Sequence, residues 1–503
     1  MSEKIAAESP ATPRKTLTTW KISVLIIASL TPLSVVVVTL PLGFAFGGPT
    51  TALMFLACGV IIGLFCVGYV QMVRRITRPG AFYNYIARGI GRPSGVGAAM
   101  LAAVGYPVGL IGTYASCAYT ISTTLGSLGI HVSYTWSFVA LAAVVGVLTW
   151  RRIDISALAS GIIVSIELLL ILALLVSIVI HKGAGAFQPA VISPSVFHYG
   201  DWTVALIFAI LSYQGFEAGA LYAPEAKRPE KSVPRALYLS LLVPTATFFF
   251  TSWILASLSG AAGFSDFVTK HGFVAFIFYE VTEYLGRAGL WLFSIGVILG
   301  LTVCSLAVNN FMARYLFGLS HDGLLPRVLS RTNKHGAPSV AAFTLLGISA
   351  LFGLGSLLVH VDPYMQLTPV SFGIGTLTST GLQLLASASV IGFFLRRPAA
   401  DRHWWKTLVA PILATLLLLG ALVAELTGFS YVTGVSAAWT NVLPLISLAA
   451  LIFGVIFGFW LKRNRPTVYT GIAEGDTAEE AAELRQQRLA RNAITPATPT
   501  EAV

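Results

Sequence analysis

The sequence predicts an all-α, polytopic membrane protein with twelve transmembrane helices. The first observation is composition: 56% of the 503 residues are hydrophobic and only 11% are charged, which leaves too little polar surface to cover a soluble core. The second is that residues 93–150 and 426–461 contain no Asp, Glu, Lys or Arg. Both runs exceed the roughly 20 apolar residues that cross a bilayer. The third is that the basic residues gather in short segments between the apolar runs. Most of the chain therefore lies in lipid.

The expected spans lie between a polar N-terminal tail, residues 1–21, and a polar C-terminal tail, residues 462–503. Each is an apolar run bounded by charged, Gly-rich or Pro-rich residues. In chain order the spans are 22–46, 51–73, 95–126, 134–150, 155–180, 201–222, 234–258, 288–312, 338–359, 366–395, 407–426 and 441–461.

The distribution of Lys and Arg predicts the orientation. With both termini on the cytoplasmic side, 29 of the 32 basic residues fall in cytoplasmic segments, as expected for the face that retains positive charge. Adding or removing one span would move many of these basic residues to the opposite side of the membrane. The net charge of +11 therefore reflects membrane topology in the cell membrane, and we expect no nucleic-acid partner. The first apolar run has no cleavage site, so we expect no signal peptide.

Two spans carry residues that interrupt a helix. In the first span, residues 29–34 read Ser-Leu-Thr-Pro-Leu-Ser; in the sixth, residues 212–219 read Ser-Tyr-Gln-Gly-Phe-Glu-Ala-Gly. Irregular backbone in a membrane is tolerated only where protein buries it or a cavity lies beside it. Ordinary proline kinks are the alternative explanation.

The interrupted spans are five apart, as expected if residues 22–180 and 201–395 form inverted repeats of five spans each, with two more spans at 407–461. A matched pair of interrupted helices predicts a binding site at the bilayer midplane. Free amides of one half-helix can hold a carboxylate there, and free carbonyls of the other can hold an ammonium group.

Four ordered motifs resemble those of one transporter family. Residues 213–217 read Tyr-Gln-Gly-Phe-Glu, and residues 224–236 contain the pattern Glu-x-Lys-x-Pro-x-Lys-x-x-Pro-x-Ala. Residues 78–85 read Arg-Pro-Gly-Ala-Phe-Tyr-Asn-Tyr, and residues 313–326 begin with Ala-Arg and end with Asp-Gly-Leu-Leu-Pro. Together they resemble the amino acid–polyamine–organocation permeases across spans 1–10, and most closely the bacterial amino acid permeases.

The resemblance implies a leucine-transporter-like fold, alternating access, and coupling to a proton or occasionally to sodium. In this family the first span usually carries a Gly-Ser-Gly-like break that receives the substrate carboxylate. Residues 31–35 read Thr-Pro-Leu-Ser-Val instead. An amine such as ethanolamine or a polyamine is therefore the alternative to an amino acid.

We expect substrate to bind at both interruptions, with one polar residue each from spans 3 and 8. For Tyr213 and Phe216 the alternative is plain core packing. For Tyr106 and Asn309 the alternative is a hydrogen bond that bridges two helices. The expected substrate-binding residues are Ser29, Thr31, Pro32, Leu33, Ser34, Tyr106, Tyr213, Gln214, Gly215, Phe216, Glu217 and Asn309.

Two intramembrane carboxylates are the candidates for proton coupling, because charge in a membrane is costly and is usually functional. Glu217 lies inside the sixth-span interruption, and Glu167 is interpreted as the only other carboxylate deep in a span. In some proton-coupled relatives a titratable Lys occupies this part of span 5. A neutral, hydrogen-bonded Glu is the alternative for Glu167. A sodium site near Thr302 and Ser305 is the alternative to a proton.

No pattern indicates an enzyme. The eight histidines are scattered and lack metal-like spacing, so we expect no catalytic centre, metal or cofactor. The four cysteines, all in apolar spans, are interpreted as small buried hydrophobic residues; they are Cys58, Cys66, Cys117 and Cys304. The sequence predicts a secondary active amino acid transporter whose partners are a small-molecule substrate, a proton and the lipid bilayer. A nutrient receptor on the same fold is the remaining alternative, and the oligomeric state is left open.

Overall fold

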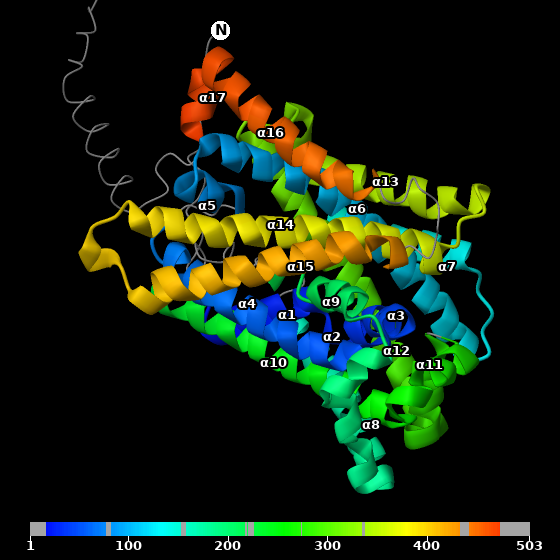
Figure 1. Ribbon diagram of the computed structural model, residues 1–503. Helices are drawn as coiled ribbons and strands as arrows, with labels where there is room; N and C mark the ends of the chain where they lie inside the picture. Colours follow the sequence, from blue (N-terminus) through cyan, green and yellow to red (C-terminus); the bar gives the residue numbers. More distant parts are fainter. Residues whose placement is uncertain are drawn as a thin grey trace, which may run out of the picture.

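The computed structural model describes residues 17–76, 82–151, 157–216, 219, 226–272, 274–333, 338–432 and 442–472. The described residues form helices and no strand, which confirms the all-α prediction for them (Figure 1). The α-helices are α1 (Thr19–Leu30), α2 (Pro32–Ser34), α3 (Leu40–Gly47), α4 (Thr51–Val73), α5 (Phe82–Gly89), α6 (Arg92–Ser127), α7 (Tyr134–Trp150), α8 (Ala157–Lys182), α9 (Trp202–Leu211), α10 (Pro229–Ser257), α11 (Gly260–His271), α12 (Ala275–His321), α13 (Ser339–Leu358), α14 (Thr368–Leu395), α15 (Ala410–Val432), α16 (Pro444–Asn464) and α17 (Pro466–Gly471).

Nine helical segments among the described residues are long and apolar enough to cross a membrane. The first of them, Thr19–Val73, runs through two of the expected spans. Two further spans correspond to the shorter apolar helices α7 and α9. The segment α12 contains the expected span 288–312 but begins earlier and has non-helical backbone at Gly286. The twelve-span count and the inverted repeat stay predictions.

The interrupted N-terminal segment lies inside the bundle. The helix α1 packs against α8, α10 and α12, and α3 packs against α9. Figure 1 shows α1, α2, α3 and α9 near the middle of the molecule, and α9 packs against the long helices α14 and α15. The outer helices expose large apolar side chains, such as Leu169 and Leu172 of α8. A lipid-facing helix surface has this character, because apolar side chains need no cover from water there.

Small residues let α6 approach two neighbouring helices closely. A Cβ atom added to Gly109 of α6 would lie 3.3 Å from the Cα of Gly375 in α14. A Cβ atom added to Gly454 of α16 would lie 2.7 Å from the Cα of Gly97 in α6. Close backbone contact through glycine is a main source of helix association in membranes, where lipid removes the hydrophobic driving force. These contacts fix the position of α6.

Replacing Gly105 by alanine is expected to destabilise the α6–α14 contact. The added Cβ would lie 1.8 Å from Oγ1 of Thr378, so the helices must separate, and overpacking of this kind costs about 1–3 kcal/mol. The thermal midpoint in detergent should therefore fall. The matched control is Gly126→Ala in the same helix, where the new methyl group would meet nothing within 4 Å. Equal midpoints for the two variants would contradict the prediction.

Candidate functional site

The interruption of the first span is centred on Thr31. This residue has φ 43° and ψ 77°, a left-handed conformation that non-glycine residues rarely adopt. Pro32 accounts for the break in the helix, since it lacks an N–H group and disfavours helical backbone at the residue before it. The chain resumes as α2 and continues through a π-helical turn at Val35–Thr39. Strained backbone of this kind persists where the surrounding structure holds it, often at functional sites.

The interruption of the sixth span begins at the end of α9. Asp201 caps the start of this helix by accepting a hydrogen bond from the backbone N–H of Thr203 at 2.9 Å. The helix ends at Leu211, and Gly215 adopts φ 99°. The side chain of Gln214 reaches α14, where its Nε2 donates a hydrogen bond to the carbonyl of Gly375 at 2.9 Å. This contact ties the interrupted segment to a long helix.

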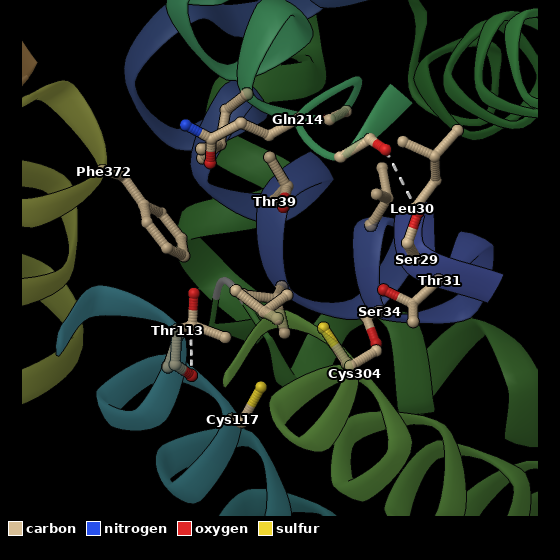
Figure 2. Close-up of a pocket in the computed structure, with 18 of the residues that line it drawn as sticks. Ser29, Leu30, Thr31, Ser34, Thr39, Thr113, Cys117, Gln214, Cys304 and Phe372 are labelled. Atoms are coloured by element: carbon tan, nitrogen blue, oxygen red, sulfur yellow. Dashed lines mark hydrogen bonds between the residues drawn. The ribbon is translucent and has the colours of Figure 1, made fainter. Parts of the chain in front are cut away.

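The two interruptions meet. Oγ of Ser29 donates to the carbonyl of Ile26 at 2.7 Å and to the carbonyl of Gly215 at 3.4 Å. A Cβ atom added to Gly215 would lie 3.2 Å from the same Oγ. Figure 2 shows the side chains of Ser29 and Gln214 around a shared space, with Thr31 and Ser34 below Ser29. The predicted pairing of the two non-helical segments is therefore present in the structure.

A cavity lies beside this junction. A volume of about 90 Å³ is open there to the centres of water molecules. A single water occupies about 10–15 Å³, so the cavity has room for a small molecule such as an amino acid. The described residues that line it carry no charged side chain. They are Ser29, Leu30, Thr31, Ser34, Val35, Val38, Thr39, Tyr106, Thr113, Ser116, Cys117, Leu211, Ser212, Gln214, Gly215, Cys304, Ala307, Val308, Phe311, Met312 and Phe372.

The lining combines hydroxyl groups near the interruptions with apolar residues opposite. Oγ of Ser34 is buried and finds no partner beyond the weak contact of the Cys304 thiol. The ring of Tyr106 packs edge-on against Phe311, with 5.9 Å between their centroids. Figure 2 shows Phe372 and Thr113 across the space from Ser29. A polar substrate end near the interruptions and an apolar end toward these rings would match the lining.

Six of the predicted residues line the cavity: Ser29, Thr31, Ser34, Tyr106, Gln214 and Gly215. Five do not, namely Pro32, Leu33, Tyr213, Phe216 and Asn309. The side chains of Tyr213 and Phe216 are fully buried, and the hydroxyl of Tyr213 donates to Oγ1 of Thr245 at 2.8 Å. For these aromatic residues the structure shows core packing. Glu217 lies outside the described residues.

Glu167 lies behind the first interruption and does not line the cavity. Its carboxylate is almost completely buried, and Oε2 accepts a hydrogen bond from the backbone N–H of Leu33 at 3.3 Å. Its other oxygen faces α12, because a Cβ atom added to Gly300 would lie 2.7 Å from Oε1. A single carboxyl group thus contacts the restarted helix after Thr31 and also abuts α12.

Several cavity residues were not predicted from the sequence. Thr39 and Ser212 belong to the two interrupted segments but were not named as binding residues. The others are hydroxyl, thiol and apolar residues within regular helices, such as Thr113, Ser116, Cys117, Cys304 and Phe372. For α6, the spacing of polar residues in the sequence could have predicted two of these cavity residues. Thr113 and Cys117 follow Tyr106 by seven and eleven positions, which places all three on one helix face.

The interpretation of Glu167 as the only other carboxylate deep in a span was wrong. Glu425 of α15 is also buried, with 1% of its surface exposed. The expected span ended at residue 426, whereas α15 continues to Val432 and places Glu425 in the helix interior. Oε1 accepts a hydrogen bond from Oγ1 of Thr380 at 2.7 Å. Neither residue lines the cavity.

Replacing Thr380 by valine is expected to lower stability by about 1–3 kcal/mol, because the buried Glu425 carboxyl loses its donor while its other oxygen already has no partner. Unfolding followed by intrinsic fluorescence in detergent measures the effect. Thr427→Val in α15 is the matched control, since that hydroxyl is exposed and bonds only to its own helix. A control that loses as much stability as Thr380→Val would contradict the assignment.

Comparison with known proteins identifies the family. The sequence profile of the amino acid permease family matches residues 17–457. The chain belongs to the amino acid permease family. It is 26% identical over 450 residues to the branched-chain amino acid permease BcaP of Bacillus subtilis (strain 168), covering 84% of this chain and 88% of the relative. It is 21% identical over 411 residues to the methylthioribose transporter of the same organism, and the match covers 77% of this chain and 87% of the relative.

A second similar permease is the branched-chain amino acid permease BcaP of Lactococcus lactis subsp. cremoris (strain MG1363), which is 24% identical over 352 residues, or 64% of this chain and 72% of the relative. These relatives are transporters and not enzymes. As a member of their family, this chain is a transporter as well. Together with the apolar helices, the match establishes a multi-pass protein of the plasma membrane. The predicted family is confirmed.

Proposed function

We propose that this permease is a secondary active transporter that carries a neutral amino acid together with a proton by alternating access. The observation that carries the proposal is the cavity at the junction of two interrupted helices, whose described lining residues carry no charge. Unsatisfied backbone groups at such interruptions suit the carboxylate and ammonium of an amino acid. The proposal includes twelve spans, two inverted repeats and cytoplasmic termini.

The character of the lining supports a neutral substrate. A polyamine would need several acidic groups around it, because buried charge is costly unless it is paired. The described lining offers hydroxyl, thiol, amide and apolar groups instead. Two relatives are branched-chain amino acid permeases, which favours a substrate with an aliphatic side chain.

The position of Glu167 supports proton coupling. An ionised carboxylate accepts the Leu33 N–H strongly, whereas a protonated carboxyl group is a weaker acceptor. Proton binding would therefore loosen the contact between α8 and the restarted helix of the first span. That contact is the proposed link between the proton and the movement of α1 and α2. The hydroxyls of Thr302 and Ser305, the sodium alternative, donate to carbonyls of their own helix.

Uptake into proteoliposomes tests the proposal. The purified chain should take up one or more neutral amino acids saturably from a radiolabelled panel that also includes cationic amino acids, ethanolamine and polyamines. An inward proton gradient should raise accumulation and a sodium gradient should not. Liposomes without protein serve as the control. Absence of saturable uptake and of counterflow for every compound would contradict the transport function, and preference for a polyamine would contradict the substrate class.

A further inference from the structure

Two cysteines from distant parts of the chain face each other on the cavity wall. Cys117 belongs to α6 and Cys304 to α12, and both line the cavity. Their thiols are in no disulfide and lie close enough to interact with each other. In Figure 2 the two sulfur atoms point into the same space below Thr39. Neither the transport proposal nor the family assignment gives this pair a role.

The described side chains nearest the pair are hydroxyls, and the buried carboxyl group of Glu167 lies near Cys304. The Cys304 thiol lies against the hydroxyls of Thr31 and Ser34, and the Cys117 thiol lies against those of Ser116 and Ser305. Within the part of the chain that the structure describes, no group of three or more His, Cys, Asp or Glu comes together. The pair therefore offers two sulfur ligands without a third strong ligand.

We propose that Cys117 and Cys304 form a two-thiol site for a soft metal ion of the Hg²⁺, Ag⁺ and Cu⁺ class. Sulfur ligands select soft cations. Ions of this class commonly bind two ligands in a linear geometry. Zinc is excluded by its requirement for four ligands or for three and a water. With mercuric chloride, two S–H bonds break and two Hg–S bonds form. Two protons and two chloride ions leave to solvent, and no electrons are transferred.

Because the site lies on the cavity wall, a bound metal ion would interfere with transport. Two thiols in contact must separate to admit an ion, and each can do so by turning about a single side-chain torsion toward the cavity. The ion would then lie opposite Thr31 and Ser34, in the space assigned to substrate. This part of the inference rests on the proposed function, whereas metal binding itself does not.

Metal counting tests the two-thiol site directly. The full chain carrying Cys58→Ser and Cys66→Ser keeps only Cys117 and Cys304, since the sequence has four cysteines. Both removed residues belong to α4 and neither lines the cavity. After mercuric chloride, a glutathione wash and desalting, elemental analysis should find one mercury per chain. Methylmercury, which forms a single Hg–S bond, should be removed by the same wash.

Variants of the pair complete the binding test. In the same background, Cys117→Ser and Cys304→Ala should each lose mercury in the glutathione wash, because a single thiol exchanges its metal with a competing thiol. Mercury that survives the wash in either variant, or two mercury ions per chain in the parent, would overturn the site. Elution at the same volume as the parent on size exclusion shows that each variant is folded.

Uptake assays place the site. Mercuric chloride should lower uptake by the Cys58→Ser, Cys66→Ser protein in proportion to the fraction of chains that hold mercury, and dithiothreitol should restore it. Substrate present during treatment should slow the loss. Full uptake with one mercury bound would overturn the position in the transport cavity. One mercury per chain in a protein that transports nothing even before treatment would contradict the proposed function and still support the two-thiol site.

Discussion

Replacing Gly215 by valine is expected to abolish uptake while the protein still folds. Gly215 has φ 99°, a conformation that costs L-residues about 1–2 kcal/mol and β-branched residues more. The new Cβ would also lie 3.2 Å from Oγ of Ser29, and its methyl groups would enter the junction. The interruptions would separate or close the cavity, and either change removes the proposed binding geometry.

Initial uptake rates in proteoliposomes at matched protein content measure this effect. The matched control is Gly347→Val in α13, an exposed helical glycine whose added Cβ would meet nothing within 4 Å. We expect the control to transport at the parent rate. Gly215→Ala should fall between the two, because it keeps the backbone strain but adds less volume. Uptake by Gly215→Val at the rate of the control would show that the junction is not part of the pathway.

Replacing Glu167 by glutamine is expected to uncouple uptake from the proton gradient. Glutamine can still accept the Leu33 N–H but cannot bind and release a proton. Substrate should therefore exchange across the membrane down its own gradient, and accumulation against a gradient should be lost. At zero proton gradient the variant and the parent should exchange substrate similarly, whereas only the parent should respond when the outside is made acidic.

Glu425→Gln provides the control for this experiment. Glu425 is a carboxylate as buried as Glu167, but it bonds to Thr380 of α14 and to no described residue of either interruption. We expect this variant to keep proton-driven accumulation. Accumulation by Glu167→Gln equal to that of the parent would end the proton-carrier role. Equal loss in both variants would indicate a general effect of removing buried acids.

The interruptions were predictable because local chemistry determines them. Pro32 cannot supply an N–H to a continuous helix, and the residue before it leaves the helical region, as Thr31 does. Gly215 is the residue type that turns with positive φ at no steric cost. The matched spacing of the two interrupted spans then predicted that they would meet, and they do at Ser29 and Gly215.

The far wall of the cavity was not predictable in the same way. Thr113, Cys117 and Cys304 lie within regular helices, and in a membrane such residues serve equally as helix contacts. Which helix face turns toward the cavity depends on packing between distant segments, such as the Gly109–Gly375 approach of α6 and α14. A single sequence does not contain that tertiary information in readable form.

Tyr213 and Phe216, which were predicted to bind substrate, lie in the core for a related reason. Tyr213 flanks the sixth-span interruption in sequence, but its ring turns into the core and meets Phe248, with 6.0 Å between centroids. Proximity along the chain does not determine the side on which a side chain leaves a non-helical turn. Glu425 was missed because the expected boundary of its span was six residues short of the helix end at Val432.

A structure of the purified permease with a transported neutral amino acid tests the central claim most directly. The account predicts ligand density in the cavity between Ser29–Ser34 and Gln214–Gly215, with the carboxylate and ammonium at the two interruptions and the side chain toward Phe311 and Phe372. Ligand density elsewhere in the bundle, with this cavity filled by side chains, would contradict it.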